Sequence, residues 1–239
     1  MAIFLDSALS EEARLAFNLG FVRGITTNPI LLAKAGRPPE QVLLELREIC
    51  PGTVFYQLTA DTLEGRRQEG EHILRLNKGV WPRSVAAHPC PESATSEPES
   101  GGGMYGKIGL KIPASTENMA LVARFASSGV EVAVTAMFSL AQAYAACEAG
   151  ATYVLPYVNR TTRLRGDGIA FVRDLAQICQ ATSRGTCVLA ASIKSPDEAV
   201  KTLLAGARHV SMPLAVLQAM GQDVLSEQAV AEFTRAASS

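Results

Sequence analysis

Short continuous apolar segments alternate with longer amphipathic segments along most of the chain. The short segments contain many β-branched residues and little alternation of apolar and polar positions, as expected of parallel strands buried on both faces. Their order along the chain favours a parallel β-sheet with helical connections. Eight such strands are predicted, at residues 2–6, 24–28, 53–58, 108–113, 131–136, 153–158, 187–192 and 209–214.

Apolar positions recur with helical spacing between these strands. A glycine follows four of the helical segments, at 20, 129, 150 and 206, where a helix commonly ends. Eight strand–helix units in 239 residues predict an α/β fold, a TIM (β/α)8 barrel in a single domain spanning 1–239. An open doubly wound sheet is the alternative, but no G-x-G-x-x-G follows the first strand. The helices that the spacing indicates most clearly are 11–19, 39–49, 115–127, 140–149, 169–181 and 196–204.

One segment interrupts this regular alternation. Residues 89–103 read PCPESATSEPESGGG and contain no large apolar side chain, so burial cannot offset the entropy lost on ordering them. We therefore expect a flexible insertion loop at about 78–105. Because it follows a helical segment ending near Asn77 and precedes the fourth strand, it should lie on the face of the barrel opposite the active site.

Composition and charge exclude several classes of protein. With 22 basic and 23 acidic side chains, the net charge of −1 gives no general attraction to nucleic acid or to an anionic membrane. No apolar segment approaches the roughly 18 residues of a membrane span, and the first residues do not resemble a signal peptide. The five cysteines form no C-x-x-C and the three histidines no metal-binding motif. We expect a cytoplasmic protein with reduced thiols, no metal and no cofactor.

Lys111 is the most informative single residue. It stands between Leu110 and Ile112 in a strand that should be buried, where a lysine is rare. Burial would lower its pKa, and a neutral amine can attack a carbonyl carbon to form a Schiff base. A lysine that reaches solvent at the strand end, or that pairs with a carboxylate, is an equally open interpretation. Lys107 shares its face of the strand but lies at the opposite end, so we expect it to be structural or exposed.

Other polar residues also gather where the predicted strands end, and in a parallel barrel these ends form the active site. Asp6 could bind or protonate a substrate hydroxyl, or cap a helix. Asn28 could bind substrate or serve as a turn residue. Gln57 brings an uncharged donor and acceptor to an otherwise apolar strand.

Two further groups come from later strands. The phenol of Tyr157 could transfer protons through a water also held by Gln57 and Thr135, although Tyr157 could simply fill the core. Arg160 and Ser192, with Lys194 close by, could form a clamp for a phosphate or another anion. A surface ion pair is the alternative for Arg160.

Five segments carry a resemblance to a known family: FLDS (4–7), GITTNP (24–29), LKIP (110–113), PYVNR (156–160) and AASIKSP (190–196). Together and in this order, they resemble the transaldolase/fructose-6-phosphate aldolase family of class I aldolases. The resemblance covers nearly the whole chain except 78–105, and it implies a metal-free enzyme that acts on a small sugar phosphate.

The resemblance also implies roles for the residues named above. Lys111 would form a Schiff base with a ketose. Asp6 and Asn28 would bind hydroxyl groups of that substrate, with Thr27 beside them. The catalytic water would be held, and protons moved, by Gln57, Thr135 and Tyr157. The phosphate would be held by Arg160, Ser192 and Lys194.

Two side chains bear on which reaction the enzyme performs. Transaldolases proper carry Glu at the position of Gln57 and Phe at that of Tyr157, so this pair resembles the small aldolase branch. That branch cleaves fructose 6-phosphate to dihydroxyacetone and glyceraldehyde 3-phosphate, or forms it from them. The alternative is a transaldolase that transfers a dihydroxyacetone unit between sugar phosphates, or acts on a sulfonated analogue.

The sequence also bears on how the chain assembles and on which other functions are disfavoured. The resemblance implies a homo-oligomer, a pentamer or a decamer, in which a longer C-terminal helix clasps a neighbouring subunit, whereas this chain ends soon after Phe233. A phosphosugar isomerase that uses histidine or carboxylate chemistry is disfavoured, because His209 opens its strand and so lies away from the mouth. A barrel that only binds or scaffolds is disfavoured by the presence of Lys111, Asp6 and Tyr157.

Overall fold

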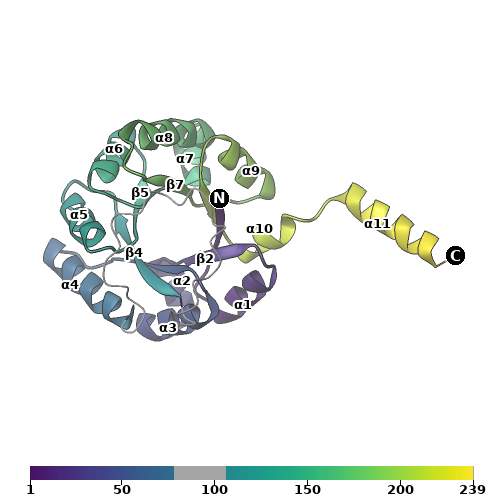
Figure 1. Ribbon diagram of the computed structural model, residues 1–239, viewed down its shortest axis with the longest axis horizontal. Coiled ribbons are helices and arrows are strands. Elements are labelled where there is room, and N and C mark those ends of the chain that lie inside the picture. The colour runs from purple at the N-terminus through teal and green to yellow at the C-terminus, as the bar shows by residue number, and fades with distance from the viewer. Residues whose placement is uncertain (78–105, 239) are drawn as a thin grey trace.

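Eight parallel strands pair in the order in which they occur in the chain, and the last pairs with the first to close a barrel. The structure, a computed structural model, describes residues 1–77 and 106–238. Helices surround the strands (Figure 1), so the predicted TIM (β/α)8 barrel is confirmed. The strands are β1 (Ala2–Asp6), β2 (Val22–Thr26), β3 (Thr53–Gln57), β4 (Lys107–Pro113), β5 (Val132–Met137), β6 (Tyr153–Pro156), β7 (Cys187–Ala190) and β8 (His209–Met212).

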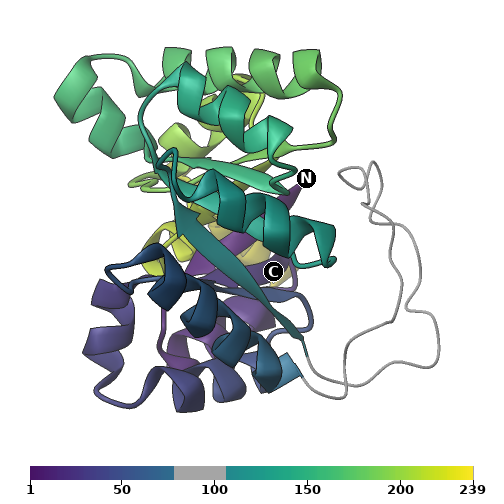
Figure 2. The ribbon, with the colours of Figure 1, turned by 90° about the vertical axis from the view of Figure 1, so that its left-hand side faces the viewer.

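The helices include all six that the apolar spacing indicated, and the four predicted glycines end helices with positive φ. In the view of Figure 2, α4 and α5 cover the side of the barrel that faces the reader. The helices are α1 (Ser10–Asn18), α2 (Pro29–Ala35), α3 (Pro39–Ile49), α4 (Leu63–Leu74) with the 3-10 turn η1 (Arg75–Asn77), α5 (Met119–Ser127), α6 (Leu140–Glu148), α7 (Val158–Arg165), α8 (Gly168–Thr182), α9 (Pro196–Leu204), α10 (Leu214–Ala219) and α11 (Val224–Ala237).

Several predicted boundaries are wrong at the ends of strands. The sixth and eighth strands stop two residues early, because Val158 and Leu214 begin the helices α7 and α10. An apolar residue at such a junction fits either element, so periodicity alone does not separate them. The seventh strand stops at Ala190, and Ser192 adopts a positive φ of 62° beyond it. Four helices, α2, α7, α10 and α11, were not predicted.

Alternate strand residues fill the interior of the barrel. An aromatic layer occupies its lower part, where Phe4 lies 6.1 Å from Phe55 and Tyr153 lies 5.3 Å from His209, measured between ring centres. Gly109 makes room for this layer, because a Cβ at that position would lie 2.6 Å from the Phe55 ring. The aromatic rings therefore fill the lower interior, and the side chains nearer the carboxyl ends of the strands line the mouth of the barrel.

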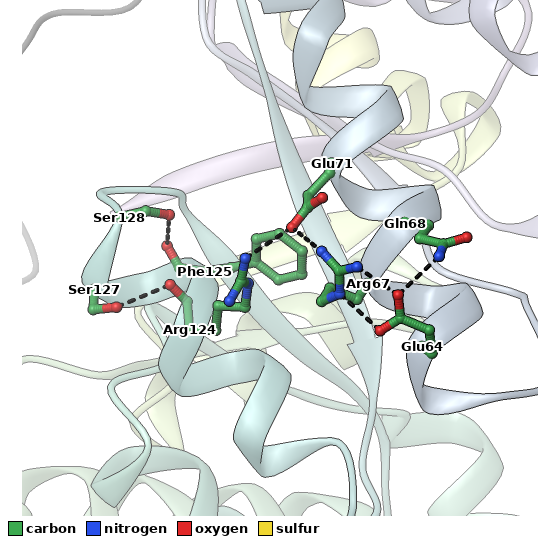
Figure 3. Close-up of polar contacts among 8 residues, drawn as sticks. All are labelled: Glu64, Arg67, Gln68, Glu71, Arg124, Phe125, Ser127 and Ser128. Atoms are coloured by element: carbon green, nitrogen blue, oxygen red, sulfur yellow. Dashed lines mark hydrogen bonds and ion pairs between the residues drawn. The ribbon is translucent and has the colours of Figure 1, made fainter.

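The outer faces of α4 and α5 are joined by charged side chains (Figure 3). Glu71 accepts hydrogen bonds from Arg67 at 2.7 Å and from Arg124 at 3.0 Å, and Arg67 also pairs with Glu64. A cavity of about 650 Å³ opens beside them, with Leu74 among its apolar walls. It lies where the helices end and the next strands begin, which is the face opposite to the carboxyl ends of the strands, so we assign it no catalytic role.

The insertion predicted at about 78–105 lies outside the described residues and stays a prediction. Within the described ranges, no helix has both the length and the apolar content needed to cross a membrane.

Candidate active site

The period of two along the strands directs one set of polar side chains into the mouth of the barrel. Phe4 and Phe55 point into the interior, so Asp6 and Gln57, two residues farther along, point the same way. Gly109 packs against Phe55 inside the barrel, which places Lys111 above it. The same count gives the members of this set: Asp6, Thr26, Gln57, Lys111, Thr135, Tyr157 and Ser211.

Lys111 is buried, with 3% of its surface exposed, and its neighbours Leu110 and Ile112 pack outward against the helices. Its Nζ donates a hydrogen bond of 2.8 Å to the main-chain carbonyl oxygen of Thr27. Burial lowers the pKa of Lys111 from 10.5 to about 8, and the negative charge of Asp6 opposes this shift. A substantial fraction of the amine is therefore neutral near pH 8, as nucleophilic attack requires.

Lys107 behaves as expected of a residue at the other end of the strand. Its side chain is exposed, and its Nζ lies 2.8 Å from Oε1 of Glu131. The two lysines thus share one face of β4 but differ in solvation, since Lys107 is exposed and Lys111 is buried.

The carboxylate of Asp6 is held by a chain of hydroxyl groups. Oγ1 of Thr26 donates to Oδ1 of Asp6 at 2.9 Å, and it also shares a hydrogen bond of 2.6 Å with the hydroxyl of Ser211. Thr26 and Ser211 are both buried. Neither residue received a role from the sequence, although the period of two from Gly24 and His209 would have directed both inward.

Gln57 lies beside Lys111 in the pairing of β3 with β4. Its Oε1 is buried and has no hydrogen-bond partner among the described residues. An unpaired buried acceptor is costly unless a bound group satisfies it. A water or a substrate hydroxyl at this position would supply the missing donor.

Thr135 and Tyr157 meet across the end of the barrel. The hydroxyl of Thr135 lies 3.0 Å from the phenol oxygen of Tyr157, and either can donate. Thr135 is buried, while Tyr157 is half-buried at the rim. The pair can therefore exchange a proton with each other and with a small molecule in the mouth.

The three residues predicted to bind an anion differ in how closely they approach Tyr157. The guanidinium carbon of Arg160 lies 4.7 Å from the centre of the Tyr157 ring, with the cation exposed. Ser192 is half-buried, and its carbonyl oxygen accepts from the backbone N–H of Asn159 at 3.3 Å. The side chain of Lys194 is exposed on the rim, and no contact within the described residues joins it to Arg160.

Thr27 and Asn28 make local hydrogen bonds. Oγ1 of Thr27 donates to the carbonyl oxygen of Phe55 at 2.8 Å, so this hydroxyl links β2 to β3. Oδ1 of Asn28 accepts from the N–H of Leu31 at 3.0 Å and caps α2, which leaves its Nδ2 available to a ligand. Asn28 is therefore a helix N-cap where a turn residue was considered, and the carbonyl of Thr27 holds the amine of Lys111.

In the part of the chain that the structure describes, no three or more His, Cys, Asp and Glu side chains gather closely enough to hold a metal ion. What the mouth offers is one low-pKa amine, one carboxylate and several uncharged hydroxyl and amide groups. That donor set suits addition of an amine to a carbonyl compound and the proton transfers that follow.

Comparisons with known proteins agree on one family. A family model described as "Transaldolase/Fructose-6-phosphate aldolase" matches residues 3–238. A "Probable transaldolase" from Herpetosiphon aurantiacus is 34% identical, over 98% of this chain and 93% of that protein. Proteins with the same name from Sorangium cellulosum and Anaeromyxobacter dehalogenans are each 31% identical over 98% of this chain, and over 95% and 94% of their own lengths.

Proposed function

Because the chain belongs to the transaldolase/fructose-6-phosphate aldolase family, we propose that it transfers a dihydroxyacetone unit between sugar phosphates through a Schiff base on Lys111. The observation that carries the proposal is the buried amine of Lys111, whose pKa is lowered to about 8. The names of the three relatives support transfer in particular.

The first half of the reaction breaks a carbon–carbon bond. The neutral Lys111 amine adds to the C2 carbonyl of a ketose phosphate, and loss of water gives an iminium ion. Asp6, held by Thr26, removes the proton of the C4 hydroxyl. The C3–C4 bond then breaks, its electron pair moves into the iminium as an enamine, and the aldose phosphate leaves.

The second half of the reaction depends on what meets the enamine. Addition to the carbonyl of another aldose phosphate, followed by hydrolysis of the new iminium, completes the transfer. A water held by Gln57, Thr135 and Tyr157 supplies and accepts the protons of these steps. The vacant acceptor of Gln57 and the Thr135–Tyr157 pair support this role.

The phosphate of the substrate would be bound at the side of the mouth formed by β6 and β7. Arg160 offers a guanidinium beside Tyr157, and the hydroxyl of Ser192 and the ammonium of Lys194 come from the loop after β7. Asn28 Nδ2 would bind a hydroxyl of the donor, with the Thr27 carbonyl orienting the amine. A sulfonate would fit the same donors as a phosphate.

Cleavage of fructose 6-phosphate without transfer is a second candidate function. Gln57 carries it, because an uncharged amide beside the water differs by a full charge from the glutamate that transaldolases proper have there. Protonation of the enamine carbon by that water returns an iminium on Lys111, and hydrolysis of this iminium then releases dihydroxyacetone and the free amine in place of transfer.

One assay separates the two candidates. The enzyme is given fructose 6-phosphate alone and then with erythrose 4-phosphate as the acceptor, and products are quantified by mass spectrometry. A seven-carbon ketose phosphate formed much faster than free dihydroxyacetone supports transfer. Release of dihydroxyacetone at the same rate with and without acceptor supports cleavage.

Borohydride trapping tests the shared intermediate. Reduction in the presence of fructose 6-phosphate, followed by peptide mass mapping, should label Lys111 alone. Absence of any adduct, with isomerase activity or with none, would overturn the Schiff-base proposal in favour of an isomerase or a scaffold. Activity should survive EDTA, which would stop a metal-dependent aldolase.

We also propose that the protein is a homo-oligomer joined through α11. This helix has no buried residue and extends away from the barrel (Figure 1). Its sequence nevertheless places an apolar stripe on one face, with Leu225 73% exposed and Phe233 71% exposed. An exposed apolar stripe of this kind is typical of a helix that packs against another protein surface. The family resemblance supports a second copy of the chain as that surface.

A further inference from the structure

Two adjacent aromatic rings, Phe138 and Tyr157, lie on the rim of the barrel with an arginine at each end. The guanidinium carbon of Arg165 lies 5.8 Å from the centre of the Phe138 ring. The Phe138 ring meets that of Tyr157 nearly at a right angle, 85°, with the centres 6.1 Å apart. Arg160 covers Tyr157 at the other end. Edge-to-face rings and cations over ring faces are both favourable arrangements.

Arg165 also holds the backbone of Phe138. Its Nη1 donates a hydrogen bond of 2.5 Å to the carbonyl oxygen of Phe138. On the other side, the N–H of Phe138 donates to Oε1 of Gln142 at 3.0 Å. Both polar groups of this residue are therefore tied, one to α6 and one to the last residue of α7.

The segment that Arg165 holds is irregular and needs such support. Ala136 adopts a positive φ of 55°, and the pairing of β5 with β6 shifts register between Val134 and Met137. A residue without glycine's freedom keeps this conformation only when its surroundings impose it. Thr135, whose hydroxyl meets the phenol of Tyr157, lies immediately before this irregular point.

We propose that Arg165 is a positioning residue for the reaction, which holds Phe138 against Tyr157 and so fixes the phenol at Thr135. The inference rests on the proposed function, because it assigns importance to the Tyr157 hydroxyl. Arg165 acts through Phe138 and touches no reacting atom. The proton transfers that pass through the Thr135–Tyr157 pair depend on Arg165, and hydrogen exchange at the enamine carbon is one of them. The attack of the Lys111 amine on the carbonyl carbon does not depend on it.

The competing role for Arg165 is direct contact with the anionic group of the substrate, since its side chain is exposed on the rim. The two roles affect different kinetic constants. Loss of a substrate contact raises KM, whereas loss of positioning lowers the rate of the proton-transfer step with KM little changed.

Arg163 provides a matched control. It lies on the same helix, carries the same charge and is also exposed. Within the described ranges it makes no hydrogen bond or ion pair, and it has no place in the proposed machinery. Arg163→Met therefore reports the effect of removing one cation from this rim.

The test compares wild type, Arg165→Met, Arg165→Lys and Arg163→Met in two partial reactions and in steady-state kinetics. The exchange of carbon-bound hydrogen of dihydroxyacetone for deuterium in D2O measures the rate of proton transfer. Borohydride trapping measures the rate at which the iminium forms. Arg165→Met should slow exchange and kcat roughly fivefold, with trapping and KM within twofold of wild type. Arg165→Lys should recover part of the loss, because an ammonium can still donate to the Phe138 carbonyl, and Arg163→Met should match wild type.

Other results would overturn the inference. A raised KM with unchanged exchange assigns Arg165 to substrate binding, and equal losses in Arg163→Met and Arg165→Met assign the effect to charge alone. Exchange unchanged in Arg165→Met rejects any positioning role. Failure of wild type to form an adduct at Lys111 would instead reject the proposed function itself, so the two failures are distinguishable.

Discussion

The Nζ of Lys111 lies 2.8 Å from the main-chain carbonyl oxygen of Thr27, although 84 positions separate the two residues in the chain. A carbonyl orients an amine through its dipole without the full negative charge that would hold a proton on nitrogen. Lys111 is therefore fixed in direction while burial keeps its pKa low. This combination is what a nucleophilic lysine requires, and the following predictions test it and its surroundings.

Replacing the amine should abolish the reaction while leaving the barrel folded. We expect Lys111→Met to lower activity at least roughly 10³-fold and to remove the borohydride adduct. It should also raise the free energy of unfolding, because an apolar side chain replaces a buried ammonium. Lys107→Met is the matched control on the same face of β4, and it should remain active. Retained activity in Lys111→Met would reject the Schiff-base mechanism.

Stability should depend on pH through Lys111. Its pKa is lowered to about 8 in the folded protein from an ordinary value of 10.5. Between these values the unfolded chain binds more protons than the folded one, so stability rises with pH across this window. Burial of the charged ammonium lowers the free energy of unfolding by about 3 kcal/mol, and this loss is complete below about pH 8. Denaturant titrations at pH 7 and pH 10 should show the difference between wild type and Lys111→Met shrinking. A difference independent of pH would contradict it.

The same titration governs the chemistry. The rate of adduct formation should rise as pH increases through about 8, because only the neutral amine attacks. Stopped reactions with borohydride across pH 6 to 9 would measure it. A rate that is flat over this range would mean that another step limits adduct formation.

The hydroxyl chain behind Asp6 should control catalysis from a distance. Thr26→Val removes the donor to Asp6 and should lower kcat roughly tenfold, because the carboxylate is no longer held in place. Thr26→Ser keeps a hydroxyl and should recover most of the rate. If Thr26→Ser is as slow as Thr26→Val, packing of the methyl group and not the hydrogen bond accounts for the loss.

Gln57→Glu should change the fate of the enamine. The new carboxylate would stand beside Lys111 in the β3–β4 pairing and would change the basicity of the water that we propose Gln57 holds. We expect transfer to increase relative to cleavage. Both activities are measured in wild type and variant with fructose 6-phosphate, with and without acceptor, and an unchanged ratio would count against the role given to Gln57.

Deletion after Gly221 should reduce the oligomeric state without unfolding the barrel, because no residue of α11 is buried within its own subunit. Phe233→Glu should weaken the assembly in the same direction, whereas Gln228→Glu, on the polar side of the helix, should not. Sedimentation velocity with circular dichroism checks both assembly and fold. An unaltered sedimentation coefficient in the deletion variant would reject the role of α11.

The sequence predicted the elements better than their ends. Continuous apolar runs marked all eight strands, and the period of two put Lys111 and Lys107 on one face of β4. The predicted sixth and eighth strands ran two residues too far, into α7 and α10, because Val158 and Leu214 suit a strand or a packed helix equally. The C-terminal helix α11 was not predicted from the sequence.

What the sequence by itself determined is the barrel and the identity of the polar residues at its strand ends, because local periodicity and the placement of apolar residues dictate both. Only the tertiary structure decided the solvation and partners of those residues. The low pKa of Lys111, its bond to Thr27 and the contact of Arg165 with Phe138 all join segments distant in the chain. Burial and hydrogen bonding depend on which atoms surround a group in space, and closure of the barrel is what brings those atoms together.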